Sequence, residues 1–115
     1  MTASKATLDE IDEFITTHTN WIVEDGKLQR IFTFRSFREA FSFMTEAAFI
    51  AEGSNHHPEW SNVYNRVTVQ LATHDAGGIT EKDFDLVASS LKGFFETGLI
   101  LDPARFLLGR QNNAN

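Results

Sequence analysis

Apolar residues near the start of the chain recur every three or four positions, which predicts a short amphipathic helix. The stripe consists of Leu8, Ile11, Phe14 and Ile15. Thr7 stands just before this stripe, and Glu10 follows Thr7 by three positions. That spacing is typical of a capping box, which satisfies the first free backbone N–H groups of a helix. The helix is therefore expected to begin after Thr7.

Two extended runs follow, Trp21 to Glu24 and Leu28 to Phe34, and they predict a β-hairpin. Asp25-Gly26 lies between the runs, and this dipeptide readily adopts the positive φ angles of a tight hairpin turn. Phe32 and Phe34 alternate with polar positions along the second run, as expected of a strand with one buried face.

The most apolar segment is a long predicted helix that Ser36 caps and that has no Gly or Pro until Gly53. Its apolar side chains cover an arc of about 180°, wider than the ~100° stripe that one core contact needs. They are Phe37, Ala40, Phe41, Phe43, Met44, Ala47, Ala48, Ile50 and Ala51, while Phe49 falls outside the arc. The excess predicts that residues 37–51 also pack against a second subunit. Replacing Phe43 and Ala47 with Glu is then expected to dissociate the assembly without unfolding the domain.

The second half of the chain predicts a further hairpin and a further helix. Residues 67–72 alternate as a strand, and Tyr64-Asn65-Arg66 can form the turn before it. Beyond Gly78, Thr80 can cap a helix in which Asp83 stands three positions on. The predicted buried stripe of this helix is Phe84, Val87, Ala88, Leu91 and Phe95.

The order helix-hairpin-helix-hairpin-helix predicts an α+β fold with two layers, a four-stranded antiparallel sheet with helices packed on one face. The 115 residues fit a single domain, 1–115, with a C-terminal extension from about residue 99. Asp102-Pro103 in this extension is a typical start of one more short helix.

Composition narrows the function classes. The net charge of −6 and the lack of a basic patch argue against direct binding of nucleic acid. The chain has no cysteine, so disulfides, a thiolate nucleophile and Cys-ligated zinc are excluded. No apolar run approaches the roughly 20 residues that span a bilayer. We expect a cytoplasmic protein that does not bind membranes, with a nuclear location also open.

The candidate chemistry lies in three of the four histidines, and three interpretations compete. His56-His57 precede Pro58, and His74 follows the second hairpin. Zinc needs three or four ligands within tetrahedral reach, and adjacent histidines suit it poorly because neighbouring side chains diverge in an extended backbone. No metal is therefore expected. The histidines can also be ordinary polar residues that cap, pack or face solvent.

Acid–base chemistry is the third interpretation. Pro58 favours an extended backbone at His57, so a rigid loop can hold two imidazoles in fixed directions. His74 joins them if its strand ends beside that loop. An imidazole with an ordinary pKa near 6.5 exists in both protonation states at neutral pH, which suits proton transfer without a cofactor. Asp83 either caps its own helix or orients His74.

The same residues resemble the signature of the pterin-4a-carbinolamine dehydratases, also known as dimerisation cofactors of a homeodomain transcription factor. The segment "AEGSNHHPEWSNVYNRVTVQLATHDAGGITEKDFDLVA" carries the resemblance, which extends over roughly residues 8–92. The matching positions are Glu52, His56, His57, Pro58, Tyr64, His74, Gly78, Thr80 and Asp83. The residues past Gly98 have no counterpart in it.

The resemblance implies a hydro-lyase that converts 4a-hydroxy-tetrahydropterin to quinonoid dihydropterin and water in tetrahydrobiopterin recycling, with no cofactor. By position, His56 and His74 are implied as the acid–base pair, and His57 as a group that mainly binds the pterin. Asp83 is implied to support His74. Glu52, Pro58 and Trp60 are implied to line or brace the substrate pocket.

The resemblance also implies partners. Family members look tetrameric through the long helix, so a homo-oligomer, dimer or tetramer, is expected to form through residues 37–51. The alternative function is that of a non-enzymatic interaction protein, a dimerisation cofactor or coactivator of a transcription factor. Fold alone does not separate the two functions. The histidine set favours the enzyme, because a scaffold has no reason to hold three imidazoles in this arrangement.

Overall fold

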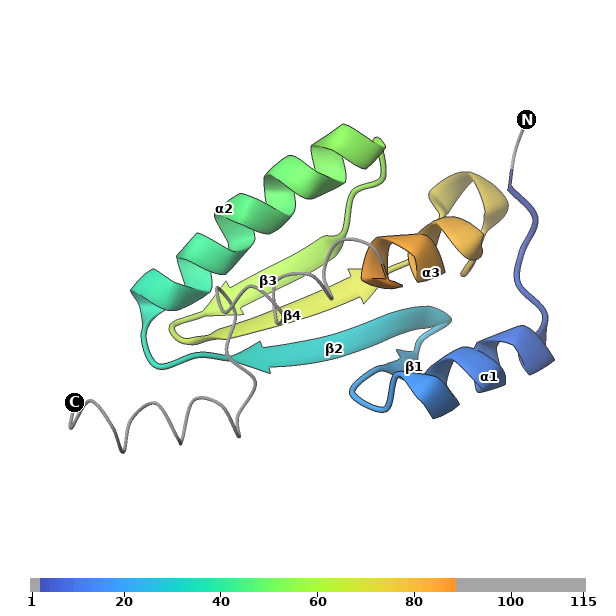
Figure 1. Ribbon diagram of the computed structural model, residues 1–115, viewed down its shortest axis with the longest axis horizontal. Helices are drawn as coiled ribbons and strands as arrows, with labels where there is room; N and C mark the ends of the chain where they lie inside the picture. The colour runs from blue at the N-terminus through green and yellow to red at the C-terminus, as the bar shows by residue number, and fades with distance from the viewer. Residues whose placement is uncertain (1–2, 89–115) are drawn as a thin grey trace.

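The first helix begins where its capping box predicts. In the computed structural model, which describes residues 3–88, α1 spans Leu8–Thr17 (Figure 1). The Thr7 hydroxyl accepts a hydrogen bond from the Glu10 backbone N–H at 3.1 Å, and the Glu10 carboxylate accepts one from the Thr7 N–H at 2.8 Å. Both predicted halves of the capping box are therefore present.

Two hairpins form one antiparallel sheet with the strand order β1-β2-β4-β3. The first hairpin joins β1, Ile22–Glu24, to β2, Lys27–Thr33, and the second joins β3, Glu59–Val63, to β4, Arg66–Leu71. Asp25 and Gly26 both have positive φ, as the predicted tight turn requires. The first strand of each hairpin is thus an edge strand, and the second is central.

The long helix α2 spans Phe37–Ser54. The Ser36 hydroxyl caps its start by accepting a hydrogen bond from the Glu39 N–H at 3.2 Å. Gly53 lies within its last turn, and the C-cap residue after Ser54 is Asn55, which has a φ of 52°. Asn adopts this left-handed conformation at lower cost than most residues and therefore suits the C-terminal cap.

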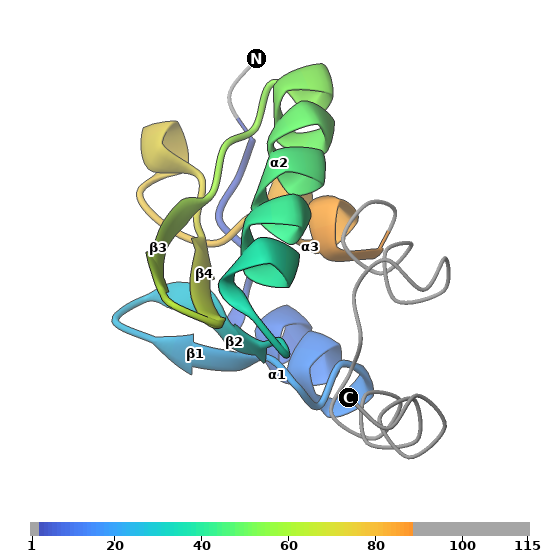
Figure 2. The ribbon, with the colours of Figure 1, turned by 90° about the vertical axis from the view of Figure 1, so that its left-hand side faces the viewer.

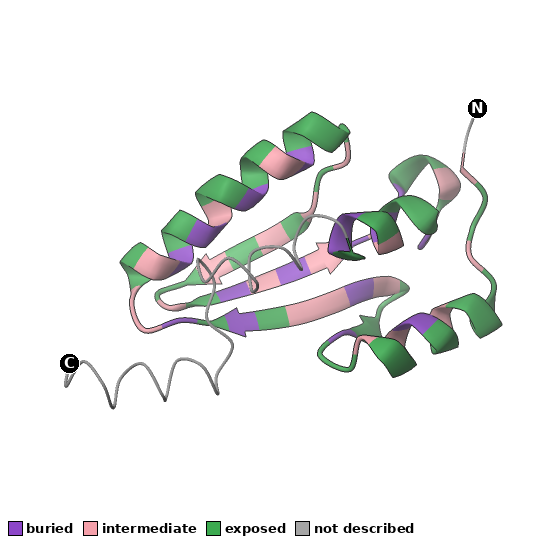
Figure 3. Cartoon of the chain, in the orientation of Figure 1, coloured by how far each residue is buried: buried purple, intermediate pink, exposed green. Residues whose placement is uncertain are grey.

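The helices cover one face of the sheet, so the α+β architecture predicted from the sequence is confirmed (Figure 2). The core lies between the two layers. Phe43 of α2 packs against Phe32 and Phe34, with ring centroids 4.6 and 5.4 Å apart. Burial follows one side of α2 and alternates along β4 (Figure 3).

The prediction about Phe43 and Ala47 is wrong. Both side chains belong to the core of the domain, with exposed fractions of 1% and 3%. A glutamate at either position would place a charge inside that core and unfold it. The large apolar side chains that α2 exposes are instead Phe37, Phe41 and Phe49. The helix is thus apolar on a second side, but Phe49, left out of the predicted arc, belongs to that side.

The third helix, α3, begins at Glu81 and is described to Leu86. Thr80 and Asp83 form its predicted capping box. Val87 is buried and Phe84 is partly buried, as predicted, but Ala88 is exposed, and the buried Leu86 was not predicted. The buried side centres on Asp83, Leu86 and Val87 because the Asp83 side chain is anchored inside the protein. Leu91, Phe95, the extension from about residue 99 and the helix predicted at Asp102-Pro103 lie outside the described residues.

The N-terminal segment supports the start of α3. The Ala6 N–H donates to the carbonyl of Ile79 at 2.8 Å, and Lys5 forms an isolated antiparallel bridge with Thr80. Between residues 3 and 88 no helix is long and apolar enough to cross a membrane.

An ion pair at the start of α2 makes stability depend on pH. The side chain and backbone N–H of Arg35 bind the Glu39 carboxylate, with hydrogen bonds of 2.6 and 2.8 Å. Burial acts to raise the pKa of Glu39, but these hydrogen bonds outweigh it, and the pKa lies below its ordinary value of 4.5. A lowered carboxyl pKa stabilises the fold above the unfolded-state pKa, and this stabilisation is lost as pH falls through the folded-state pKa.

We therefore predict that Glu39→Gln lowers the free energy of unfolding by about 1 kcal/mol at pH 7 and by progressively less as pH falls through the folded-state pKa. Urea denaturation at several pH values measures this difference. Glu46→Gln is the matched control, because Glu46 lies exposed on the same helix. An equal effect of Glu39→Gln at pH 7 and pH 3 would show that the ionised pair is not its cause.

Candidate active site

The antiparallel register brings the two histidine segments to the same end of the sheet. Glu59, the first residue of β3, pairs with Gln70, the penultimate residue of β4. His56 and His57 therefore lead into the sheet where β4 leaves it toward His74 (Figure 1). The sequence predicted that His74 joins the other two histidines only if its strand ends beside their loop. The register shows that β4 does end at that place.

His56 is bound to a buried carboxylate. Its Nε2 lies 2.5 Å from Oδ1 of Asp83, and the exposed fractions of the two side chains are 12% and 0%. His56 comes from the loop after α2, while Asp83 comes from the first turn of α3. This contact joins two elements that are 27 residues apart in the sequence.

The other carboxylate oxygen of Asp83 accepts two hydrogen bonds. Oδ2 accepts hydrogen bonds from the Thr73 hydroxyl at 3.0 Å and from the Thr80 backbone N–H at 2.9 Å. The two threonine hydroxyls lie 2.6 Å apart. Asp83 therefore caps α3 and also orients a histidine, but that histidine is His56. The implied pairing of Asp83 with His74 is wrong, because His56, Thr73 and Thr80 occupy the carboxylate.

His57 points to a different partner. Its Nε2 lies 2.7 Å from Oε1 of Glu52, on the last turn of α2, and both side chains are largely exposed. The two adjacent histidines thus diverge, one toward a buried carboxylate and one toward a carboxylate at the surface, as expected for neighbouring residues in an extended backbone.

A cavity of about 610 Å³ opens beside this surface pair. Glu52, from the last turn of α2, lines it together with His57, Pro58 and Trp60, and further residues of α2 complete the lining. The four residues implied to bind substrate therefore line one hollow. The other residues from α2 are Phe41, Met44, Thr45, Ala48, Phe49 and Ala51. An apolar wall with a carboxylate and an imidazole at its rim suits a flat heterocycle that carries hydrogen-bonding groups.

His74 occupies a short turn after the sheet. The strand ends at Leu71, and His74 begins the 3₁₀ helix η1, His74–Ala76. The side chain is exposed and, among residues 3–88, makes no hydrogen bond with another group. His74 shares this end of the sheet with His56 and His57 but makes no hydrogen bond to either of them.

No three His, Asp or Glu side chains within residues 3–88 converge closely enough to hold a metal ion. The fourth histidine, His18, lies apart from the candidate site. It caps the end of α1 and stacks on Phe14, with ring centroids 4.0 Å apart.

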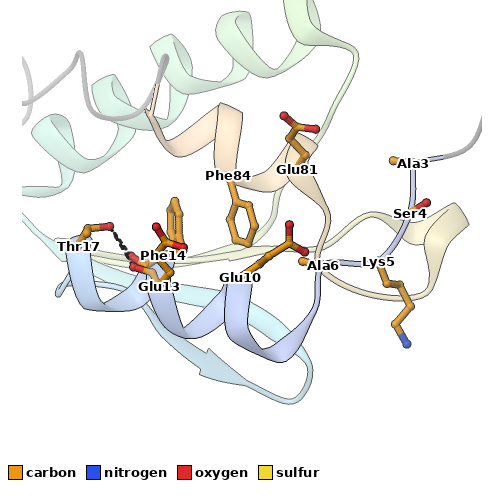
Figure 4. Close-up of a pocket in the computed structure, with 10 residues that line it drawn as sticks. All are labelled: Ala3, Ser4, Lys5, Ala6, Glu10, Glu13, Phe14, Thr17, Glu81 and Phe84. Carbon is orange, nitrogen blue, oxygen red and sulfur yellow. Dashed lines mark hydrogen bonds between the residues drawn. The ribbon is translucent and has the colours of Figure 1, made fainter.

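A second cavity, of about 630 Å³, lies between the N-terminal segment, α1 and the start of α3 (Figure 4). The rings of Phe14 and Phe84 stack within it, with centroids 4.5 Å apart, and Glu10, Glu13 and Glu81 stand around them. None of the residues that the sequence singled out for catalysis or substrate binding lines this cavity.

Sequence reasoning missed Thr73 as a member of the site. Thr73 is buried and contacts both Thr80 and Asp83. Its position directly before His74 was the only signal, and a lone threonine at the end of a strand carries little information.

The chain is similar to several known proteins. Residues 4–91 match the family model described as pterin 4 alpha carbinolamine dehydratase. A relative from Solibacter usitatus, named "Putative pterin-4-alpha-carbinolamine dehydratase", is 54% identical over 85 residues, which are 74% of this chain and 90% of that protein. A protein of the same name from Opitutus terrae is 55% identical over 78 residues, covering 67% of this chain and 80% of its own.

A solved structure is similar as well. The crystal structure of a transcriptional coactivator/pterin dehydratase from Brucella melitensis superposes with a TM-score of 0.69 at 44% identity. The match covers 72% of this chain and 90% of that one.

The buried carboxylate generates a stability prediction. Asp83→Ala leaves the Thr73 hydroxyl, the Thr80 N–H and His56 without their acceptor, so the free energy of unfolding should fall by about 3 kcal/mol. Chemical denaturation measures this loss. Glu81→Ala on the exposed side of the same helix is the control and should change stability by about 0.5 kcal/mol or less. A similar small change for both variants would contradict the assigned hydrogen bonds.

Proposed function

Because this chain belongs to the pterin 4 alpha carbinolamine dehydratase family, we propose that it dehydrates 4a-hydroxy-tetrahydropterin to quinonoid dihydropterin, as a hydro-lyase acting in tetrahydrobiopterin recycling. The observation that carries this proposal is the buried His56–Asp83 pair, next in sequence to the cavity that His57, Glu52, Pro58 and Trp60 line. A cavity of this size suits a bound heterocycle, and an imidazole held in one orientation, on the residue before His57, suits proton transfer.

The reaction needs one acid and one base. The C4a–O bond breaks, and the departing hydroxyl takes a proton from the acid and leaves as water. The N5–H bond gives its proton to the base, and its electron pair forms the C4a=N5 double bond. One histidine in the imidazolium form and one in the neutral form supply both groups, and the enzyme regains its original state once a proton returns through water.

We assign the acid–base roles to His56 and His74, which approach the same end of the sheet from two segments. Asp83 supports this chemistry by orienting His56. The role of His57 is to bind the pterin, together with Glu52. A pterin presents a row of N–H donors that a carboxylate can accept, and the flat ring can lie on Pro58 and Trp60 in the cavity.

A second function rests on the exposed side of α2. Phe37, Phe41 and Phe49 are exposed there, and solvent-facing aromatic groups of this kind mark protein contacts. The Brucella melitensis relative is described as a coactivator as well as a dehydratase. We propose that this side of α2 forms a homo-oligomer, a dimer or tetramer, and that the same surface is available to a transcription-factor partner.

The catalytic assignment predicts the behaviour of histidine variants. The decay of freshly generated 4a-hydroxy-tetrahydropterin, followed by ultraviolet absorbance, should be faster with the protein than in buffer. His56→Ala and His74→Ala should each lower kcat by about 10²–10⁴-fold, the usual contribution of one general acid or base. A metal chelator should leave the wild-type rate unchanged.

His18→Gln is the matched control, because this histidine lies at the end of α1 and should leave the rate unchanged. Decay no faster than in buffer would rule out the dehydratase. Full activity of the His56 and His74 variants would instead reject the acid–base roles while retaining the enzyme.

The oligomer proposal yields a separate prediction. The double variant Phe41→Glu, Phe49→Glu should dissociate the assembly and remain folded, because these side chains are 55% and 72% exposed in the single chain. Ile31→Glu is the control, since Ile31 is 52% exposed on the sheet face opposite the helices. Light scattering after size-exclusion chromatography measures the mass. An unchanged mass for the double variant would exclude this side of α2 as the interface.

A further inference from the structure

The hydrogen atoms around Asp83 can be assigned from the chemistry of its neighbours. Thr80 donates its backbone N–H to Oδ2, and Thr73 donates its hydroxyl proton to the same oxygen. Thr73 has only one such proton, so the 2.6 Å contact between the two hydroxyls must use the proton of Thr80. The Thr80 hydroxyl therefore donates a hydrogen bond to the Thr73 hydroxyl, which in turn donates one to Asp83.

The remaining oxygen determines the state of His56. An ionised carboxylate only accepts hydrogen bonds, so the short contact between Oδ1 and Nε2 requires a proton on Nε2. A neutral imidazole carries one proton, which leaves Nδ1 unprotonated. Within residues 3–88 no protein group hydrogen-bonds to Nδ1.

We propose that Thr73 is a positioning residue for His56: with Thr80 it orients the Asp83 carboxylate, which holds His56 as the Nε2–H tautomer and leaves Nδ1 as the atom that exchanges a proton with the substrate. This proposal rests on the proposed function for the identity of the substrate. The tautomer itself does not depend on any substrate.

Thr73 also shapes, through its backbone, the turn that carries His74. Its N–H donates to the carbonyl of Gly78 at 2.8 Å, and its own carbonyl accepts from the N–H groups of Ala76 and Gly77 at 3.1 Å. These bonds close the turn that begins with His74. One residue therefore shapes the turn that carries His74 and, through its hydroxyl, orients the carboxylate that binds His56.

The threonine donors make a specific prediction for Asp83→Asn. The amide oxygen must face the two donors, Thr73 and Thr80, because the NH₂ group cannot accept their protons. The NH₂ group then faces Nε2 of His56 and donates to it. This variant should invert the tautomer of neutral His56 to Nδ1–H, just as an asparagine in place of a triad aspartate selects the wrong tautomer.

The experiment is long-range ¹H–¹⁵N NMR on protein labelled with ¹⁵N-histidine, without substrate, at about pH 8, where ordinary imidazoles are neutral. Protonated and unprotonated ring nitrogens give widely separated ¹⁵N shifts, and His56→Gln identifies the His56 signals. We expect Nε2–H in the wild type and Nδ1–H in Asp83→Asn. In Thr73→Val we expect shifts averaged between tautomers, because the carboxylate, without the Thr73 donor, turns away from His56 part of the time. Thr73→Ser retains the hydroxyl and should restore the wild-type spectrum.

Either of two results would overturn the proposal: an Nδ1–H tautomer in the wild type, or wild-type shifts in Thr73→Val. The Thr73→Val variant keeps the test decisive if Asp83→Asn does not fold. In the dehydration assay, Thr73→Val should lower kcat about tenfold with KM unchanged, and Thr73→Ser should recover it. Because the spectra need no substrate, expected shifts in a protein without dehydratase activity would reject the proposed function alone.

Discussion

The fold of this protein and its candidate chemistry both depend on one buried carboxylate. Asp83 is fully enclosed, and a buried charge of this kind is tolerated only when its oxygens are hydrogen-bonded. Its partners come from three segments: the loop after α2, the end of the sheet and the start of α3. The same bonds that satisfy the charge therefore fix where α3 begins and how His56 is held. A substitution of any of these partners should therefore change both the stability of the fold and the orientation of His56.

The sheet register supplies the rest of the geometry. Strands β3 and β4 pair so that the chain enters one and leaves the other at the same end, which brings segments almost twenty residues apart to one place. The helix α2 contributes to both the core and the cavity. Its buried side packs on the sheet, and its other side and last turn line the cavity beside His57. Because the cavity wall includes Phe41 and Phe49, assembly through this side of α2 would reshape or cover the proposed substrate site.

Local signals predicted most of the fold. The capping residues Thr7, Ser36 and Thr80 and the Asp25-Gly26 turn act within four residues of themselves, so their effects can be predicted from the sequence. The pairing of Asp83 with His56 could not be predicted this way, because it depends on how α3 lies against the loop after α2. The orientation of α2 was misjudged for a related reason: periodicity showed an apolar arc of about 180° but not which part of it faces the sheet, so Phe43 and Ala47 were assigned to the subunit interface.

The most direct test of the central claim is a crystal structure of the protein with a bound dihydropterin that cannot react. We predict that the pterin ring lies in the cavity beside Glu52, His57, Pro58 and Trp60, with Nε2 of His56 still bound to Asp83. A pterin bound instead in the cavity between α1 and α3, against Phe14 and Phe84, would contradict it.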